Sequence, residues 1–307
     1  MFFKNNYQLS LAAITLALIF CSQTTFADGA KYYSPHEGYQ VETNPQSHPR
    51  FMEMVENLPE TWSIWANENL SKENLTNIYA VAAWSAVTLA TDYETWQMFR
   101  EPHLENRSLE IWNYHMVSMG DGYFQFLLAG IWGAYGYSAS NNRALRTASQ
   151  IVETITATGA VVQIIKHSTG RESPFQTSTR TGNWEPFPEQ VKYHKDVQKY
   201  DAVPSGHIAT AHATFIVIWE NYPEYKWIPY IGYPLISLIS VGLVSTSLHW
   251  WSDIPLGIAL GHSFAKVVTR RNKIGPAKSS SKYVPDLVPM ANPSYGQPPL
   301  LGLRWQW

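Results

Sequence analysis

The chain has 307 residues, enough for one large domain or two small ones, and its formal net charge of −2 gives no reason to expect a nucleic-acid partner. Charged residues make up 15% of the chain, below the roughly 25% of ordinary soluble domains. The mean hydropathy of −0.22 is nevertheless not that of a typical multi-pass membrane protein.

Residues 1–27 are predicted to be a signal peptide. Lys4 supplies a positive charge, residues 9–21 are apolar, and Thr25-Phe26-Ala27 offers a cleavage site. A membrane anchor is the alternative, but the apolar run is shorter than the roughly 20 residues of a spanning helix. Cleavage would remove Cys21, the single cysteine, and so exclude disulfides, thiol catalysis and cysteine metal sites. We expect a protein of the bacterial periplasm or cell envelope, with a multi-pass inner-membrane protein as the alternative.

The remainder is predicted to be all-α, with a single helical bundle domain of about six core helices over residues 75–269. A polar arm, residues 28–74, precedes this domain and has one short helix near 51–57. A basic, Pro/Ser-rich tail, residues 270–307, follows it and is expected to be loosely ordered. The segments whose apolar residues favour helices are 77–91, 121–138, 145–166, 205–222, 227–248 and 252–268. Residues 101–118 carry charges in a mixed helical pattern and are also predicted to be helical.

One helix start combines several features of an anion-binding site. Pro204 cannot lie inside a helix, Ser205 is a good N-cap, and Gly206 lets a ligand approach the backbone. His207 would then lie in the first turn, beside unpaired N–H groups and the positive end of the helix dipole. A histidine there can also exchange a proton near neutral pH.

Two further segments carry matching chemistry. Lys166 places a cation at the end of an apolar helix, and Arg171 follows five residues later. His249 and Asp253 are four residues apart, so one helical turn would bring them together and let the carboxylate orient the imidazole. Two histidines, a carboxylate, a helix N-terminus and cations are the components of phosphoryl transfer without a metal.

These segments resemble the three motifs of the type 2 phosphatidic acid phosphatase superfamily, which includes bacterial class A acid phosphatases and vanadium haloperoxidases. The resemblance covers about residues 145–265 and implies the helical fold of those enzymes. The matching residues are Lys166, Gly170, Arg171 and Pro174 in the first motif, Pro204 to His207 in the second, and His249 and Asp253 in the third.

The resemblance implies a phosphomonoesterase, and lipid phosphates at a membrane surface are among its expected substrates. His249 Nε2 would attack phosphorus to form a phosphohistidine, with Asp253 orienting the ring. His207 would protonate the leaving alkoxide and then activate water. No metal or other cofactor is expected. The phosphate oxygens would be held by Lys166, Ser205 and the Gly206 N–H.

The chain departs from the family at two positions that normally carry phosphate-binding arginines, which are Ser173 and Leu243 here. The loss of two charged donors weakens phosphate binding unless other cations replace them. Ser173 precedes a proline and favours extended chain, so Arg171, two residues earlier, is expected to point the same way and bind phosphate. Further candidates in the long connection 167–203 are Arg180, His194 and Lys195.

Two alternatives remain open at this point. A helical envelope protein could retain the fold without activity, although the retained histidines, Asp253 and Lys166 argue against it. A vanadate-dependent haloperoxidase is less favoured, because its vanadate site relies on both missing arginines. In a phosphatase, vanadate would act only as an inhibitor.

Overall fold

The computed structural model describes residues 49, 52–177, 179–273, 286–290 and 300–304. The predicted signal peptide, most of the predicted tail and the beginning of the predicted arm lie outside the described residues. The helices are α2 (Glu53–Glu56), α3 (Leu58–Asn69), α4 (Leu75–Leu89), α5 (Asp92–Glu105), α6 (Arg107–Gly120), α7 (Gly122–Ser138), α8 (Asn142–Thr169), α9 (Gln190–Lys195), α10 (Gly206–Asn221), α11 (Ile228–Ser245) and α12 (Ile254–Lys273). Short 3-10 turns are η1 (Lys72–Asn74), η2 (Val197–Lys199) and η3 (Trp251–Asp253).

The predicted all-α fold is confirmed. The described strands are β1 (Asp286–Met290) and β2 (Leu300–Arg304), which form one antiparallel pair. This pair was not predicted, and neither was α3, since the prolines of that region were taken to indicate an irregular arm. Pro59 lies in the first turn of α3, where a missing N–H leaves no hydrogen bond unmade.

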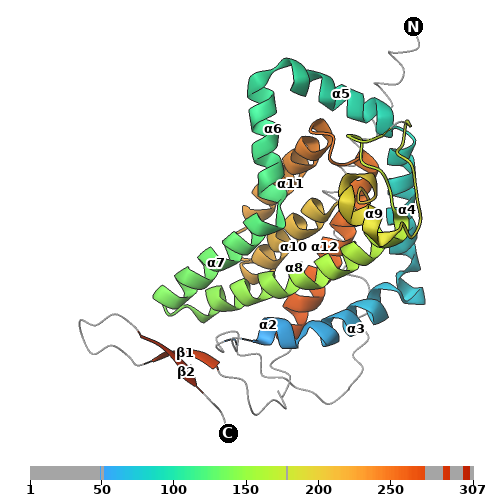
Figure 1. The fold of residues 1–307 in the computed structure, drawn as a ribbon. Coiled ribbons are helices and arrows are strands. Elements are labelled where there is room, and N and C mark those ends of the chain that lie inside the picture. Colours follow the sequence, from blue (N-terminus) through green and yellow to red (C-terminus); the bar gives the residue numbers. More distant parts are fainter. Residues whose placement is uncertain (1–48, 50–51, 178, 274–285, 291–299, 305–307) are drawn as a thin grey trace.

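The helix α8 runs through the middle of the bundle, as Figure 1 shows, and contacts α7, α10 and α12 along its length. α10 lies against α12, α11 packs against α6, and α3 reaches both α8 and α12. The core between these helices is built from apolar side chains of α8, α10, α11 and α12, including the fully enclosed Ile151, Ile208, Ile216 and Leu243. The bundle therefore fixes the end of α8 relative to the start of α10.

Close packing of α10 on α12 depends on two glycines of α12. A Cβ added at Gly257 would lie 2.8 Å from the Ser205 carbonyl oxygen, and one at Gly261 would collide with the Ala209 carbonyl oxygen. Since neither position has a side chain, the backbones of the two helices approach each other directly. This contact holds the first turn of α10, where His207 lies.

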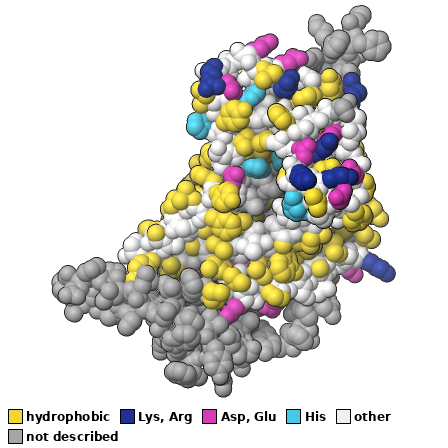
Figure 2. Space-filling model, in the orientation of Figure 1, with side chains coloured by type: hydrophobic (Ala, Val, Ile, Leu, Met, Phe, Trp, Pro, Cys, Tyr) yellow, Lys and Arg dark blue, Asp and Glu magenta, His cyan; other side chains and the backbone are white. Residues whose placement is uncertain are grey.

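Several helices expose apolar surface. α8 and α11 are long and apolar enough to cross a membrane by length and composition alone, and about half of each apolar stretch is buried in the protein. α7 carries no charged residue and exposes Tyr123, Leu127 and Ile131. Figure 2 shows hydrophobic side chains spread widely over the face that it views. These features are a weak indication of contact with a membrane.

Candidate active site

The two predicted catalytic histidines lie together. His207 is in the first turn of α10, and His249 follows α11 in the segment that leads to η3. Their ring centroids are 5.9 Å apart and the ring planes are 73° apart. Ser205 caps α10 as predicted, because its hydroxyl accepts a bond from the Ile208 N–H at 3.4 Å. The N–H groups of Gly206 and His207 precede the helical ladder and are available to a ligand.

The tautomer of His249 follows from its nearest partner. His249 Nδ1 lies 2.7 Å from the Ala202 carbonyl oxygen. A carbonyl oxygen can only accept, so Nδ1 carries the proton and Nε2 keeps a lone pair. His249 Nε2 has no protein partner among the described residues, and it is not one of their fully enclosed unpaired atoms. The geometry therefore presents a nucleophilic nitrogen toward the accessible side of the ring.

Asp253 is close to His249 but is not its main hydrogen-bond partner. Asp253 Oδ2 lies 3.5 Å from His249 Nδ1 and accepts a bond from the Trp250 N–H at 2.8 Å. The sequence predicted that Asp253 orients the His249 ring. In the structure Asp253 and the Ala202 carbonyl oxygen share this role. Sequence reasoning missed Ala202 because a backbone carbonyl leaves no signal in side-chain identity.

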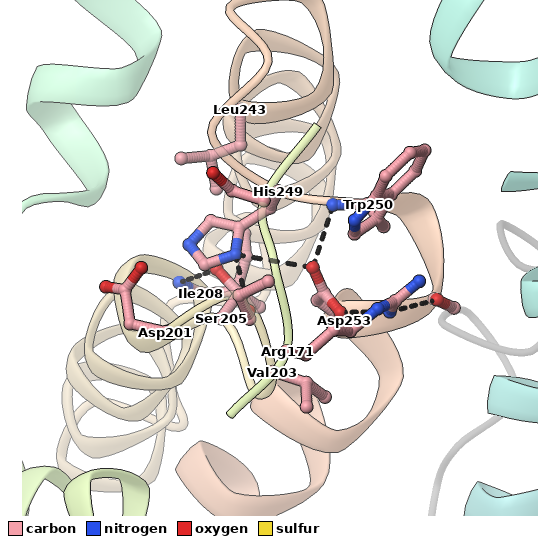
Figure 3. Close-up of polar contacts among 12 residues, drawn as sticks. Arg171, Asp201, Val203, Ser205, Ile208, Leu243, His249, Trp250 and Asp253 are labelled. Carbon is pink, nitrogen blue, oxygen red and sulfur yellow. Dashed lines mark hydrogen bonds and ion pairs between the residues drawn. The ribbon is translucent and has the colours of Figure 1, made fainter. Parts of the chain in front are cut away.

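Arg171 does not have the role that was predicted for it. Its side chain is only 1% exposed, and Nη1 donates to Ser252 Oγ at 2.7 Å and to Asp253 Oδ1 at 2.5 Å. Nη2 donates to Asp92 Oδ2 at 2.7 Å, and both Nε and Nη2 donate to the Thr181 carbonyl oxygen. Every N–H of the guanidinium is therefore committed inside the protein, as Figure 3 shows for its contact with Asp253. The expectation that Arg171 binds phosphate is corrected, because a structural network has taken its donors.

That network contains Asp92, which sequence analysis did not identify. Asp92 opens α5 and is fully buried. Its carboxylate accepts from the Ser252 N–H at 3.0 Å and from Ser252 Oγ at 2.5 Å, as well as from Arg171. Burial raises the pKa of Asp92 to about 6, although Arg171 opposes that shift. Asp92 thus holds Arg171 in place, and Arg171 in turn holds one oxygen of Asp253.

Lys166 reaches the site from the last turn of α8. Its side chain is 8% exposed, and Nζ lies 3.1 Å from Asp201 Oδ2. Gly170 ends the helix with a φ of 55°, which turns the chain away four residues after Lys166. Asp201 was not singled out in the sequence, although it lies only three residues before Pro204. The cation expected to meet phosphate therefore shares its charge with a carboxylate.

The remaining candidates lie elsewhere. Arg180 pairs with Glu94 and stacks over Tyr93 on α5, with its side chain 66% exposed. His194 lies on α9 beside the rings of Tyr193 and His167. Lys195 is exposed on the same helix. None of the three is seen to contact His207, His249 or Lys166.

The two family arginine positions are closed to solvent. Ser173 is 1% exposed, and both its N–H and its hydroxyl bind the Gln198 carbonyl oxygen, at 3.0 and 2.9 Å. Leu243 is fully buried in the apolar core. Neither position offers a donor to the site.

The environment of His207 makes it a weak base. Burial, together with the neighbouring His249 and Lys166, lowers its pKa to about 4, while Asp121 and Asp201 act in the opposite direction. The imidazole is therefore neutral at neutral pH. In the part of the chain that the structure describes, no three His, Cys, Asp or Glu side chains gather in a way that could hold a metal ion.

Comparison with known families agrees with the motifs. A family model described as the PAP2 superfamily matches residues 147–273, which include Lys166, His207, His249 and Asp253. A search of the curated proteins and one of the solved structures found no match. The match confirms the resemblance to type 2 phosphatidic acid phosphatases.

Proposed function

Because residues 147–273 of this chain match the PAP2 superfamily model, we propose that the protein is a metal-independent phosphomonoesterase that acts through a phosphohistidine at His249. Members of this superfamily are generally phosphatases that act on phosphate esters. The observation that carries the proposal is the bond from His249 Nδ1 to the Ala202 carbonyl at 2.7 Å. It fixes the tautomer with a lone pair on Nε2, the atom that has to attack phosphorus.

In the first step His249 Nε2 forms a bond to phosphorus while the bond from phosphorus to the ester oxygen breaks. The departing alkoxide takes a proton from His207, which is neutral in the free protein and takes up this proton when the reactive complex forms. The positive charge on the phosphorylated imidazole is stabilised by the carboxylate of Asp253, whose Oδ2 lies 3.5 Å from Nδ1. In the second step His207, now neutral, accepts a proton from water, and the resulting hydroxide displaces His249 from phosphorus.

The phosphate oxygens would lie between Lys166 and the start of α10. The free N–H groups at Gly206 and His207 and the helix dipole favour an anion there. Among the described residues of this site, Lys166 is the cation that has N–H donors left, after its bond to Asp201. We further propose a place in the bacterial envelope after removal of residues 1–27, and access to lipid phosphates through the exposed apolar helices.

The proposal is tested by hydrolysis of p-nitrophenyl phosphate without added metal. We expect wild-type protein to be active and His249→Ala to be inactive. Brief reaction of the wild type should leave an acid-labile phosphoenzyme, which His249→Ala cannot form. His115→Ala, on the exposed face of α6, serves as the control and should retain full activity.

His207 is tested separately with a poor leaving group. His207→Ala should slow the hydrolysis of propyl phosphate by about 10²- to 10⁴-fold, the usual contribution of a general acid. Release of p-nitrophenolate needs no proton, so the first turnover of p-nitrophenyl phosphate should be much less affected. A folded wild-type protein that hydrolyses neither ester, nor any lipid phosphate offered in detergent, would instead support the non-catalytic alternative. Peroxide-dependent halide oxidation with vanadate would support the haloperoxidase alternative.

A further inference from the structure

The charge around the two histidines is less positive than the motifs led us to expect. Ser173 and Leu243 contribute no donor to the site. Arg171 is committed to buried carboxylates and a carbonyl. Lys166 remains, but its charge is balanced by Asp201 at 3.1 Å. A phosphate dianion therefore enters a site where the nearest fixed positive and negative charges cancel.

Asp201 is placed to contact a ligand as well as Lys166. Its side chain is 26% exposed, whereas that of Lys166 is 8% exposed. Oδ2 accepts the bond from Lys166, and Oδ1 has no hydrogen-bond partner among the described residues. Figure 3 shows the Asp201 carboxylate on the side of the His249 ring that faces away from Asp253. That is the side on which Nε2 has to meet phosphorus.

A second carboxylate acts on the same part of the site. Asp121 lies at the junction of α6 and α7, where Oδ1 accepts the Tyr123 N–H at 2.8 Å and Oδ2 has no partner among the described residues. Asp121 and Asp201 both favour the protonated form of His207. Asp121 directly follows Gly120, where an added Cβ would lie 3.2 Å from His207 Cβ. Its carboxylate therefore adds negative charge near the group that meets the leaving oxygen.

Resting on the proposed phosphatase activity, we infer that Asp201 is a specificity-determining residue that makes this site prefer phosphate monoesters whose leaving alcohol carries an ammonium group. In such a substrate the phosphate contacts Lys166 and the start of α10. Its ammonium group, two carbons beyond the ester oxygen, donates to Asp201 Oδ1. The substrate brings its own cation to a site that lacks the family arginines. A phosphate ester with an uncharged alkyl group offers no cation to Asp201, whose carboxylate then pairs with Lys166 alone.

The inference is tested first by binding, with ligands that cannot be hydrolysed. Calorimetry compares 3-aminopropylphosphonate, in which a methylene replaces the ester oxygen, with butylphosphonate, which has the same number of chain atoms but no ammonium group. We expect the wild-type protein to bind the amino compound roughly tenfold more tightly, as one charge-assisted hydrogen bond would give. Asp201→Asn should reduce this preference to about twofold or less. The matched control Glu185→Gln removes an exposed carboxylate from the same connection and should keep the full preference.

A kinetic comparison separates this inference from the proposed activity. The ratio of kcat/KM for phosphoethanolamine to that for propyl phosphate should show the same preference, and Asp201→Asn should remove it mainly through the substrate with the ammonium group. Equal affinity of wild-type protein for the two phosphonates, or a preference that survives in Asp201→Asn, would overturn the inference while hydrolysis of p-nitrophenyl phosphate upheld the activity. A clear binding preference without any hydrolysis would overturn the activity and leave the selectivity standing. Failure to bind either phosphonate would overturn the inference, and hydrolysis of p-nitrophenyl phosphate would decide the activity separately.

If Asp201→Asn does not fold, as judged by circular dichroism, Asp121→Asn takes its place. Its expected effect is a smaller loss of the same preference, because Asp121 follows Gly120, which packs against His207, and so adds negative charge near the same histidine. An unchanged preference in a folded Asp121→Asn protein would then count against the inference.

Discussion

At the scale of single residues, the low pKa of His207 decides how the reaction depends on pH. Burial places this pKa at about 4 in the free protein, while the second pKa of a phosphate monoester is about 6. The reactive complex needs one proton on His207 and a phosphate dianion. Above pH 6 the free protein, at His207, and the free phosphate ester together hold one proton fewer than this complex.

For propyl phosphate we therefore predict that kcat/KM rises about tenfold per pH unit as the pH falls from 8 to 6. Between about pH 6 and 4 the substrate monoanion supplies the proton to neutral His207, so the profile should level off. Stopped or coupled assays of phosphate release across this range measure the profile. His207→Gln should abolish the rise. A wild-type profile that is flat from pH 8 to 6 would show that no proton is taken up before the leaving group departs.

Arg171 gives a prediction about stability rather than about phosphate binding. Its guanidinium is 1% exposed and lies between the fully buried carboxylates of Asp92 and Asp253. Removing the cation leaves two buried charges without compensation, which costs about 3–5 kcal/mol in comparable cases. Arg171→Met should lower the free energy of unfolding by that amount in urea denaturation.

The comparison for Arg171 is Arg180→Met, in the same connection. Arg180 is 66% exposed in its pair with Glu94, and an exposed pair contributes at most about 1 kcal/mol. A similar small loss in both variants would show that the Arg171 network contributes little. A large loss confined to Arg171 would agree with the buried network.

The residues proposed to perform the chemistry could be identified from the sequence, but their hydrogen-bond partners could not. His207, His249, Asp253 and Lys166 belong to motifs in which residue type and spacing carry the information. Asp92 lies 160 positions from Ser252 in the sequence, and only the fold brings the two together. Arg171 was misassigned for the same reason, since the carboxylates that occupy its donors are invisible to local spacing.

At the scale of elements, apolar periodicity predicted most core helices because their buried faces repeat with the helical period. The segment 101–118 was the exception, since the chain breaks it into α5 and α6 at Asn106. The Asn106 side chain accepts bonds from the Ser108 and Leu109 N–H groups and so caps α6. Both halves look helical in composition, and one capping residue between them is a weak signal.

The contact between α10 and α12 yields a prediction at this scale. Gly261 faces the Ala209 carbonyl so closely that an added Cβ would collide with it. Gly261→Ala should therefore lower stability by about 1–3 kcal/mol, as overpacking does, and should also reduce activity by displacing the first turns of α10. Thermal unfolding and p-nitrophenyl phosphate hydrolysis measure the two effects.

The control for Gly261 is Gly130→Ala on α7, where an added Cβ meets no atom within 4 Å. Alanine is favoured over glycine in a helix by about 1 kcal/mol, so this variant should be as stable as the wild type or more stable. If Gly261→Ala left stability and activity unchanged, the close approach of the two backbones would not be needed for the site.

At the scale of the whole molecule, the site exists only where distant elements meet. The end of α8 supplies Lys166, the start of α10 supplies His207, and the segment after α11 supplies His249. α5 contributes Asp92, which holds the network behind them. Activity is therefore coupled to global stability. Conditions that weaken the packing of α10 against α12 should also disturb the arrangement of the site.

Two stacked histidines between α10 and α12, the buried His212 and the partly buried His262, predict such a condition. Burial lowers the pKa of His212 to about 4 and that of His262 to about 3, from an ordinary value of 6.5. Because the unfolded chain binds these protons more readily, stability is full above about pH 6.5 and is lost as the pH falls. For His212 alone the loss at pH 5 is roughly 2 kcal/mol. Asp92, with its raised pKa, works in the opposite direction because the folded state holds its proton up to about pH 6.

Urea unfolding at pH 7 and pH 5 should therefore show a smaller pH-dependent loss of unfolding free energy in His212→Leu than in wild type, while His115→Ala should match wild type. An equal loss in all three proteins would mean that His212 is already protonated in the folded state.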